Sequence, residues 1–268
     1  MSPELEAAIQ AVKEAGALVM GKYRGNYETV LKTDESPVTE ADLASQECLE
    51  KRLENFGYGF VGEESKDLEF PTGRVWVVDP LDGTKDFIHQ TDDFAIMVGL
   101  VENQEVLAGV VHLPAQDLTY WAERGQGAYK QEGDSEPRRL EVSTVSTLPE
   151  ARVVTSRFHL DEDTKRFLEQ AGITQTATVG SLGFKIASVA EGAMDLYLTT
   201  TNKTYLWDIC AGDIILQEAG GEMVDLRGQP FVYDGRQLRN EHGILVTNGR
   251  LTSSARAVVE QLKEANER

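Results

Sequence analysis

Basic residues are scarce in this chain of 268 residues. Lysine and arginine together number 26 against 45 aspartates and glutamates, which gives a formal net charge of −19 at pH 7. Proteins that bind a nucleic-acid backbone need clustered cations to meet the phosphates, so this balance excludes a nucleic acid as partner. Hydrophobic residues nevertheless make up 41% of the chain, which is enough for the sizeable core of an ordinary globular protein.

Cysteines and long apolar runs are also few or absent. Cys48 and Cys210 lie far apart in helix-like patterns, which indicates two buried free thiols in a reducing compartment and not a disulfide scaffold. No apolar run approaches the roughly 20 residues of a membrane span. The N-terminal sequence MSPELEAAIQ has no basic region followed by an apolar stretch. We therefore expect a soluble, cytoplasmic protein without a membrane partner.

Histidine is the third scarce residue type. The four histidines, His89, His112, His159 and His242, are scattered and form neither an HExxH motif nor a paired spacing. Zinc sites normally use histidine or cysteine ligands at short, regular spacings. A zinc enzyme is therefore not expected.

Periodic apolar residues predict a layered α+β protein in which helices cover mixed sheets. The first half, residues 1–140, opens with two helices, the second capped by Thr39 with Asp42 at its third position. Short strands and an antiparallel meander follow. The polar segment 131–140 is expected to be a mobile connection to the second half, residues 141–268, in which strands and helices alternate. The predicted helices of the first half span residues 4–20 and 41–56, and its predicted strands span 59–64, 74–79, 94–100, 106–113 and 118–121.

Acidic side chains stand where several of these predicted elements begin or end. The residues concerned are Asp42, Glu63, Glu64, Asp79, Asp82 and Asp208. Mg²⁺ is bound through oxygen ligands, usually carboxylates together with water and substrate phosphate. The pattern therefore predicts a site for a hard divalent cation.

The segment VVDPLDGTKDF carries the densest part of this pattern. Asp79 ends a predicted strand, Pro80 blocks further strand pairing, and Gly83 permits a close approach of the backbone. Asp79 and Asp82 are therefore expected to converge on one ion. If the amides of Gly83 and Thr84 begin a helical turn, they would face a phosphate, which would then bridge the metal and the helix.

The four aspartates among these acids also have a purely structural interpretation. Asp79 and Asp82 could cap turns, Asp42 could complement the dipole of its helix, and Asp208 could be the N-cap of the helix that follows it. Capping and metal binding can coexist. A non-catalytic protein that binds Ca²⁺ is a further alternative, although the acids come from four segments and lack the loop periodicity of an EF-hand.

Four motifs together resemble the signatures of the inositol monophosphatase superfamily, whose members are Mg²⁺-dependent, lithium-sensitive phosphomonoesterases. They are SPVTEAD at 36–42, GEES at 62–65, DPLDGTKDF at 79–87 and WDICAGDIILQEAGG at 207–221. The resemblance covers essentially the whole chain. It implies an αβαβα sugar-phosphatase sandwich and, by analogy with the family, a homodimer.

The resemblance also implies the roles of individual residues. The implied metal ligands, for two or three Mg²⁺ ions per active site, are Glu64, Asp79, Asp82, Asp208 and the carbonyl of Leu81. Asp42 would lie near a more weakly held ion, and Glu63 is left as a neighbour of this set. Thr84 would orient the attacking water together with Glu64, so the implied catalytic residues are Glu64, Thr84 and Asp42. One ion would lower the pKa of the water, both would neutralise phosphate oxygens, and the second would stabilise the leaving alkoxide.

The expected substrate is a small phosphate ester. Within the superfamily the chain is most similar to the bacterial 3′(2′),5′-bisphosphate nucleotidases, which remove the 3′-phosphate from 3′-phosphoadenosine 5′-phosphate. This similarity rests on Lys85 in DGTKDF, on VVTSRFH at 153–159 and on GSLGFKIASVAEG at 180–192. The implied substrate-binding residues are Gly83, Thr84, Arg157, Ser181, Lys185 and Asp208.

Two features of the sequence leave the substrate open. Arg157 and Lys185 could meet a second phosphate, or each could be a solvated surface cation. Thr201 stands where inositol-specific members tend to carry a glutamate, and the Arg- and Pro-containing stretch of the nucleotidases is also absent there, although Lys203 could supply a cation. Inositol 1-phosphate and fructose 1,6-bisphosphate therefore stay as alternatives.

Overall fold

The computed structural model describes residues 1–25, 29–31, 37–65, 70–158 and 160–266. Ser36 of the first motif and His159 lie outside these residues. Among the described helices, none has both the length and the apolar character that a membrane crossing requires.

The helices of the described residues follow the expected order along the chain. The α-helices are α1 (Pro3–Lys22), α2 (Glu40–Leu53), α3 (Thr84–His89), α4 (Glu162–Gln170), α5 (Leu182–Ala190), α6 (Cys210–Glu218) and α7 (Thr252–Asn266). Two short 3₁₀ helices occupy Glu54–Phe56 and Leu148–Glu150.

Within the described ranges, the strands form two large sheets and two small ribbons. The seven-stranded sheet contains, in spatial order, β3 (Gly59–Gly62), β4 (Val75–Asp82), β5 (Ala95–Glu102), β6 (Glu105–Leu113), β7 (Leu118–Glu123), β8 (Gly127–Glu132) and β9 (Arg138–Arg139). The five-stranded sheet contains, in spatial order, β11 (Gln175–Val179), β10 (Arg152–Ser156), β12 (Leu196–Thr199), β16 (Ile244–Thr247) and β14 (Glu222–Val224). The ribbons pair β1 (Thr29–Leu31) with β2 (Pro37–Thr39) and β13 (Thr204–Tyr205) with β15 (Arg239–Asn240).

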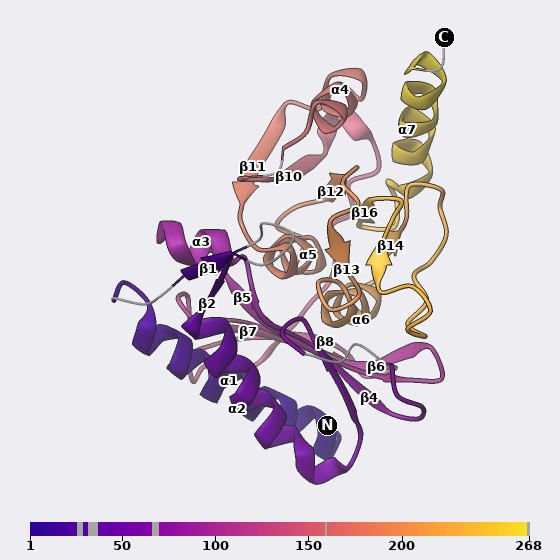
Figure 1. Ribbon diagram of the computed structural model, residues 1–268. Helices are drawn as coiled ribbons and strands as arrows, with labels where there is room; N and C mark the ends of the chain where they lie inside the picture. Colours follow the sequence, from indigo (N-terminus) through magenta and orange to yellow (C-terminus); the bar gives the residue numbers. More distant parts are fainter. Residues whose placement is uncertain (26–28, 32–36, 66–69, 159, 267–268) are drawn as a thin grey trace.

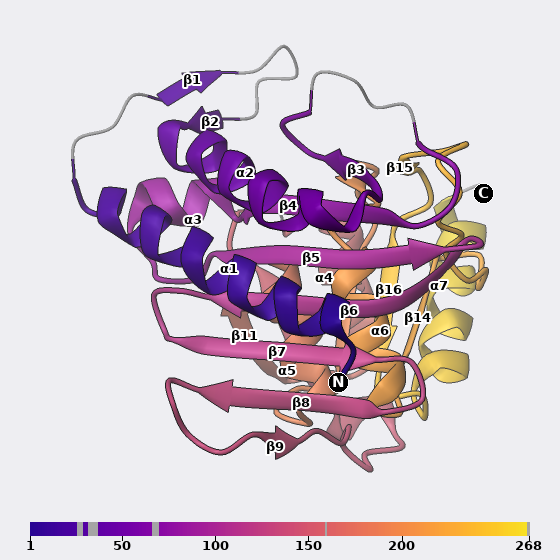
Figure 2. The ribbon, with the colours of Figure 1, turned by 90° about the horizontal axis from the view of Figure 1, so that it is seen from below.

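Five layers of secondary structure are stacked through the molecule, as Figure 1 shows. Helices α1 and α2 cover one face of the seven-stranded sheet, and in Figure 2 they lie across its strands. Helices α5 and α6 fill the space between the two sheets, and α4 and α7 cover the outer face of the five-stranded sheet. This arrangement confirms the expected αβαβα sandwich.

The predicted boundary between the two halves falls where the first sheet ends. All strands of the larger sheet precede residue 140, and all strands of the five-stranded sheet follow it. The segment 131–140 is itself part of the sheet, because Tyr129 and Lys130 of β8 pair with Arg139 and Arg138. Since α5 and α6 share one apolar core with both sheets, the division into two halves stays a prediction.

The start of α2 has the predicted cap. The Thr39 hydroxyl accepts a hydrogen bond from the amide of Ala41 at 3.1 Å, and the amide of Thr39 donates to Asp42 Oδ2 at 2.8 Å. This reciprocal arrangement satisfies amides that the first turn of a helix leaves without partners. It also fixes the Asp42 carboxylate at the end of α2 that faces β4.

Helix α6 reaches the seven-stranded sheet through a glycine contact. A Cβ atom at Gly109 of β6 would lie 2.5 Å from the carbonyl oxygen of Ala211 in α6. Any larger residue would therefore push α6 away from the sheet. The packing matters for function because the segment that leads into α6 carries Asp208.

We predict that Gly109→Ala lowers the free energy of unfolding by about 1–3 kcal/mol, since an overpacked core must shift to make room. Gly21→Ala is the matched control, because a Cβ at Gly21 meets nothing within 4 Å. In the last turn of α1 that change should raise stability by up to about 1 kcal/mol. Urea titrations of both variants test this; equal stability of Gly109→Ala and the unmodified protein would contradict the packing described.

Candidate active site

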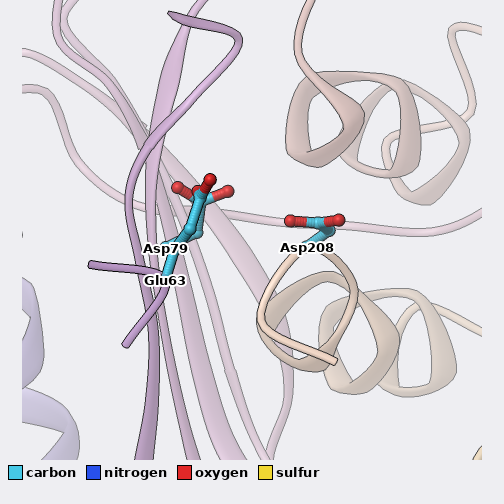
Figure 3. A group of neighbouring side chains, drawn as sticks. All are labelled: Glu63, Asp79 and Asp208. Carbon is cyan, nitrogen blue, oxygen red and sulfur yellow. The ribbon is translucent and has the colours of Figure 1, made fainter. Parts of the chain in front are cut away.

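Three carboxylates from separate elements converge between the two sheets. Ligand oxygens of Glu63, Asp79 and Asp208 all lie within 4.8 Å of one another. In Figure 3 the side chains of Glu63 and Asp79 lie next to each other, and the carboxylate of Asp208 faces them from the segment before α6. The acids that the sequence pattern singled out therefore contribute to one cluster, although not all of them belong to it.

The register of two strands decides which of the adjacent glutamates joins Asp79. Strands β3 and β4 are parallel, with Gly62 opposite Val78, and the amide of Glu63 donates to the carbonyl of Val78 at 3.1 Å. The next residues along, Glu63 and Asp79, are thus neighbours at the ends of the two strands. Glu63 and Glu64 both lie in the turn that follows β3, and of the two only Glu63 belongs to the carboxylate cluster.

Glu64 therefore does not occupy the position predicted for it. Its amide donates to Gln46 Oε1 of α2 at 3.0 Å, and it is not one of the three members of the carboxylate cluster. Glu63, which had no assigned role, takes the predicted place of Glu64. The sequence motif located the acidic pair, but only the fold shows which of the two glutamates joins the carboxylate cluster.

A β-bulge directs Asp79 and Asp82 into the same cleft. In an unbroken strand, residues three positions apart point to opposite faces. Here the pairing of β4 with β5 shifts, because Asp79 lies opposite Met97 whereas Asp82 lies opposite Ala95. The extra residue falls at Pro80 and Leu81, where proline has no amide to offer a neighbouring strand. Both carboxylates consequently line one cleft. Asp82 is not a member of the carboxylate cluster, so the convergence of the two on one ion stays a prediction.

Asp208 is positioned by the turn before α6. Its Oδ2 accepts a hydrogen bond from the amide of Tyr205 at 2.7 Å. The N-cap of α6 is Ile209, which makes no side-chain cap. The alternative interpretation of Asp208 as a helix cap is therefore wrong, and its carboxylate is directed toward Glu63 and Asp79.

The electrostatics of this cluster favour a cation. Burial, followed by repulsion from Glu63 and the neighbouring aspartates, raises the pKa of Asp79 well above its ordinary value. Burial and repulsion from Glu63 raise the pKa of Asp208 in the same direction. A raised pKa means that the ionised acid destabilises the folded protein at neutral pH, a cost that is relieved as the pH falls through the folded-state pKa. A bound divalent cation would offset this repulsion directly.

The donor set also fits a hard divalent ion. All three side chains offer carboxylate oxygens, which Mg²⁺ prefers, and neither histidine nor cysteine takes part. Oxygens on opposite sides of one Mg²⁺ ion are about 4.2 Å apart. The distances between these carboxylate oxygens therefore need little adjustment to surround an ion. Glu63, Asp79 and Asp208 would be its ligands.

Asp42 combines a structural contact with one to the site. Oδ2 accepts from the amide and the hydroxyl of Thr39, whereas Oδ1 accepts from the Thr84 hydroxyl at 3.1 Å. The same hydroxyl also lies 3.1 Å from the carbonyl of Leu81. Burial raises the pKa of Asp42 to about 6, with a further contribution from Glu63. The observed partner of Thr84 is therefore Asp42, in place of the predicted Glu64.

Asp82 connects the carboxylate cluster to α5. Its Oδ2 accepts hydrogen bonds from the Ser181 hydroxyl and from the amide of Gly183, the latter at 2.7 Å. Ser181 is the N-cap of α5 and is almost fully buried. Ser181, predicted to bind substrate, is instead placed to hold Asp82. Gly83, the next residue, adopts a left-handed conformation with φ of 87°, which favours glycine at the turn into α3.

The acidic cluster lies in a cleft of about 220 Å³ that also contains three lysines. Lys85, Lys185 and Lys203 line it together with Thr84 and Thr201. Lys85 and Lys185 come from the motifs that the sequence singled out. Lys203, which the sequence offered as a further cation, comes from the loop before β13.

Lys185 is buried and is not a solvated surface cation. Only 3% of its surface is exposed, and its ammonium group donates to the carbonyl of Gly180 and lies 5.4 Å from the centre of the Tyr197 ring. Burial lowers its pKa to about 8, while Asp82, Asp86 and Asp93 oppose the decrease. Lys185 is therefore largely protonated at neutral pH. No sequence motif pointed to Tyr197, and the place of its ring in the cleft follows from the fold alone.

Arg157 does not have the position expected of a phosphate ligand. Its guanidinium group forms ion pairs with Asp86, at 3.1 Å, and with Asp93. It is not among the residues that line the cleft. Arg157 instead ties the end of β10 to α3 and to the segment before β5.

Comparison with known proteins identifies the family. The model of the inositol monophosphatase family matches residues 1–264. The 3′(2′),5′-bisphosphate nucleotidase CysQ of Escherichia coli K12 is 33% identical over 240 residues, covering 87% of this chain and 95% of the relative. The inositol-1-monophosphatase of Bacillus subtilis is 31% identical over 249 residues, covering 91% of each.

Solved structures agree with this match. The inositol monophosphatase of Thermotoga maritima superimposes with a TM-score of 0.82 at 30% identity and covers 98% of this chain and 99% of its own. The chain belongs to the inositol monophosphatase family, as its motifs predicted, and its enzyme class is that of the phosphoric monoester hydrolases.

We predict that Mg²⁺ stabilises this protein and that Asp208→Asn removes most of the effect. At a concentration about 100 times Kd, a bound ligand adds about 2.7 kcal/mol, or roughly 5–10 °C in Tm for a chain of this size. Without metal, the variant should be more stable than the unmodified protein, because the cluster loses one repelling charge.

Asp213→Asn is the control for this experiment. Asp213 is buried on α6, where it accepts hydrogen bonds from Gln217 and Tyr233, and it lies outside the cluster. The control should retain the full shift in Tm with Mg²⁺. Equal shifts in the two variants, measured by differential scanning calorimetry, would contradict the assignment of Asp208.

Proposed function

We propose that this chain is a Mg²⁺-dependent 3′(2′),5′-bisphosphate nucleotidase that hydrolyses 3′-phosphoadenosine 5′-phosphate to AMP and phosphate. The observation that carries the proposal is a buried lysine, Lys185, in the same cleft as Glu63, Asp79 and Asp208. A substrate with two phosphates needs two positive centres. A metal bound by the acids would supply only one of them.

Glu63, Asp79 and Asp208 would hold the metal, with Asp82 and the carbonyl of Leu81 as further candidate ligands. Bound there, Mg²⁺ would lower the pKa of a water molecule and neutralise charge on the phosphate oxygens. The other catalytic and binding roles are proposed for side chains of the cleft and for Asp42 beside it.

Thr84 and Asp42 are proposed to orient the attacking water. When its proton is directed to Asp42 Oδ1, the Thr84 hydroxyl can accept a hydrogen bond from water with its own lone pair. Asp42 is held by the cap of α2, so this acceptor is in position before substrate binds. Prior positioning of the acceptor lowers the entropic part of the barrier to an in-line displacement.

Lys185 is proposed to bind the phosphate that is not hydrolysed. Its ammonium group is desolvated by burial, so a phosphate that reaches it meets a charge with little competing water. Lys85 and Lys203 reach the same cleft and can add to the attraction of an anionic substrate. Arg157, paired with two aspartates, is assigned no phosphate.

Inositol 1-phosphate is the second candidate substrate. The similarity to the Bacillus subtilis inositol-1-monophosphatase supports it, and the same metal-binding acids would act on it. It has only one phosphate, however, and leaves the charge of Lys185 without a substrate partner. A non-catalytic Ca²⁺ protein is not supported, since the chain belongs to a family of hydrolases.

The proposal is tested by Mg²⁺-dependent phosphate release from 3′-phosphoadenosine 5′-phosphate, inositol 1-phosphate and fructose 1,6-bisphosphate, compared by kcat/KM. We expect the highest value for the nucleotide, no activity in the presence of a chelator, and inhibition by Li⁺. A higher kcat/KM for either sugar phosphate would overturn the assignment of substrate and leave the family assignment intact.

Lys185→Met should raise KM for the nucleotide by about 10- to 100-fold, because a charge-assisted contact to phosphate contributes about 1.5–3 kcal/mol. The variant keeps the length and volume of the buried side chain. Hydrolysis of inositol 1-phosphate should change several-fold less. Lys130→Met, which removes a part-buried lysine bonded to Glu191 outside the cleft, is the control; equal losses on both substrates in Lys185→Met would remove Lys185 from substrate recognition.

A further inference from the structure

The rim of the cleft carries an exposed aromatic side chain that the chemistry of the phosphates does not use. Phe158 lines the cleft and has 38% of its surface exposed. Among the large apolar side chains that are exposed in the described residues, it is the one aromatic. Isolated exposed apolar residues are common, so its significance depends on how it is held.

Phe158 contacts the ring of His89, and the residue before it is anchored beside the cleft. Its ring lies 5.1 Å from that of His89, with an angle of 32° between the planes. His89 ends α3, the helix that begins at Thr84. The preceding residue, Arg157, is anchored by ion pairs to Asp86 and Asp93, and its amide donates to the carbonyl of Val179 at 3.3 Å. Phe158 is therefore supported beside the cleft by His89 and by the anchored backbone of Arg157.

The size of the cleft indicates what lies against this ring. Pockets that enclose a drug-sized ligand measure about 300–1,000 Å³, whereas this cleft measures about 220 Å³. A nucleotide is larger than this space, so part of it would extend to the rim, where Phe158 lies. A planar base suits an aromatic face there, because bases stack on aromatic side chains. A cyclitol or furanose ring has no planar face to offer.

We propose that Phe158, supported by His89, is the surface on which the base of the nucleotide substrate stacks, and so a residue that determines specificity. This inference rests on the proposed nucleotidase function. Stacking of a base on an aromatic side chain typically accounts for roughly a 5- to 100-fold change in affinity when that side chain is removed.

The test compares kcat and KM of the full-length protein for 3′-phosphoadenosine 5′-phosphate and inositol 1-phosphate in three variants. Phe158→Leu keeps an apolar side chain but removes the planar face, and should raise KM for the nucleotide at least about fivefold with little change in kcat. Phe158→Trp keeps the face and should retain the nucleotide KM or lower it. Leu160→Ala, a neighbour equally exposed at 38% and outside the cleft, is the matched control and should change neither substrate.

The outcomes separate this inference from the proposed function. If the unmodified protein does not prefer the nucleotide, the nucleotidase function and the stacking role both fail. The stacking role alone is overturned if the unmodified protein does prefer the nucleotide but Phe158→Leu leaves the nucleotide KM unchanged. It is also overturned if Phe158→Leu raises KM equally for inositol 1-phosphate. A loss confined to the nucleotide in Phe158→Leu, with recovery in Phe158→Trp, supports it.

Discussion

Repulsion among Glu63, Asp79 and Asp208 is the interaction on which the rest of the site depends. The three carboxylates are brought within 4.8 Å by separate elements, and burial with mutual repulsion raises the pKa of both aspartates. A fold that pays this electrostatic cost without a cation is less stable at neutral pH. The cluster thus destabilises the fold unless a divalent cation offsets the repulsion. Lysine, serine and threonine side chains of the site surround it.

Three backbone features hold these charges in place. The parallel register of β3 and β4 places Glu63 beside Asp79, the bulge at Pro80 and Leu81 turns Asp82 into the cleft, and the turn before α6 directs Asp208 toward both. The close contact of Gly109 with α6 fixes that helix on the sheet. Each feature belongs to the sandwich itself, so the geometry of these carboxylates follows from packing.

The sequence predicted the order of elements and the acidic motifs because both depend on local patterns. The cap at Thr39 and Asp42, the meander and the αβαβα sandwich are confirmed. It could not separate Glu63 from Glu64, since that depends on register with β4, which begins at Val75, 13 residues after the last residue of β3, Gly62. Nor could it tell that Lys185 is buried in the cleft whereas Arg157 is paired with Asp86 and Asp93, because their surroundings come from distant segments.

The central claim is that the cluster binds a divalent cation. The most direct measurement is the anomalous diffraction of crystals soaked in Mn²⁺, which has the same preference for carboxylate oxygens as Mg²⁺. We predict an anomalous peak between Glu63, Asp79 and Asp208, with Glu64 outside the coordination sphere. A peak coordinated by Glu64 in place of Glu63, or the absence of any peak at this cluster in crystals whose soaked protein is active, would contradict the account.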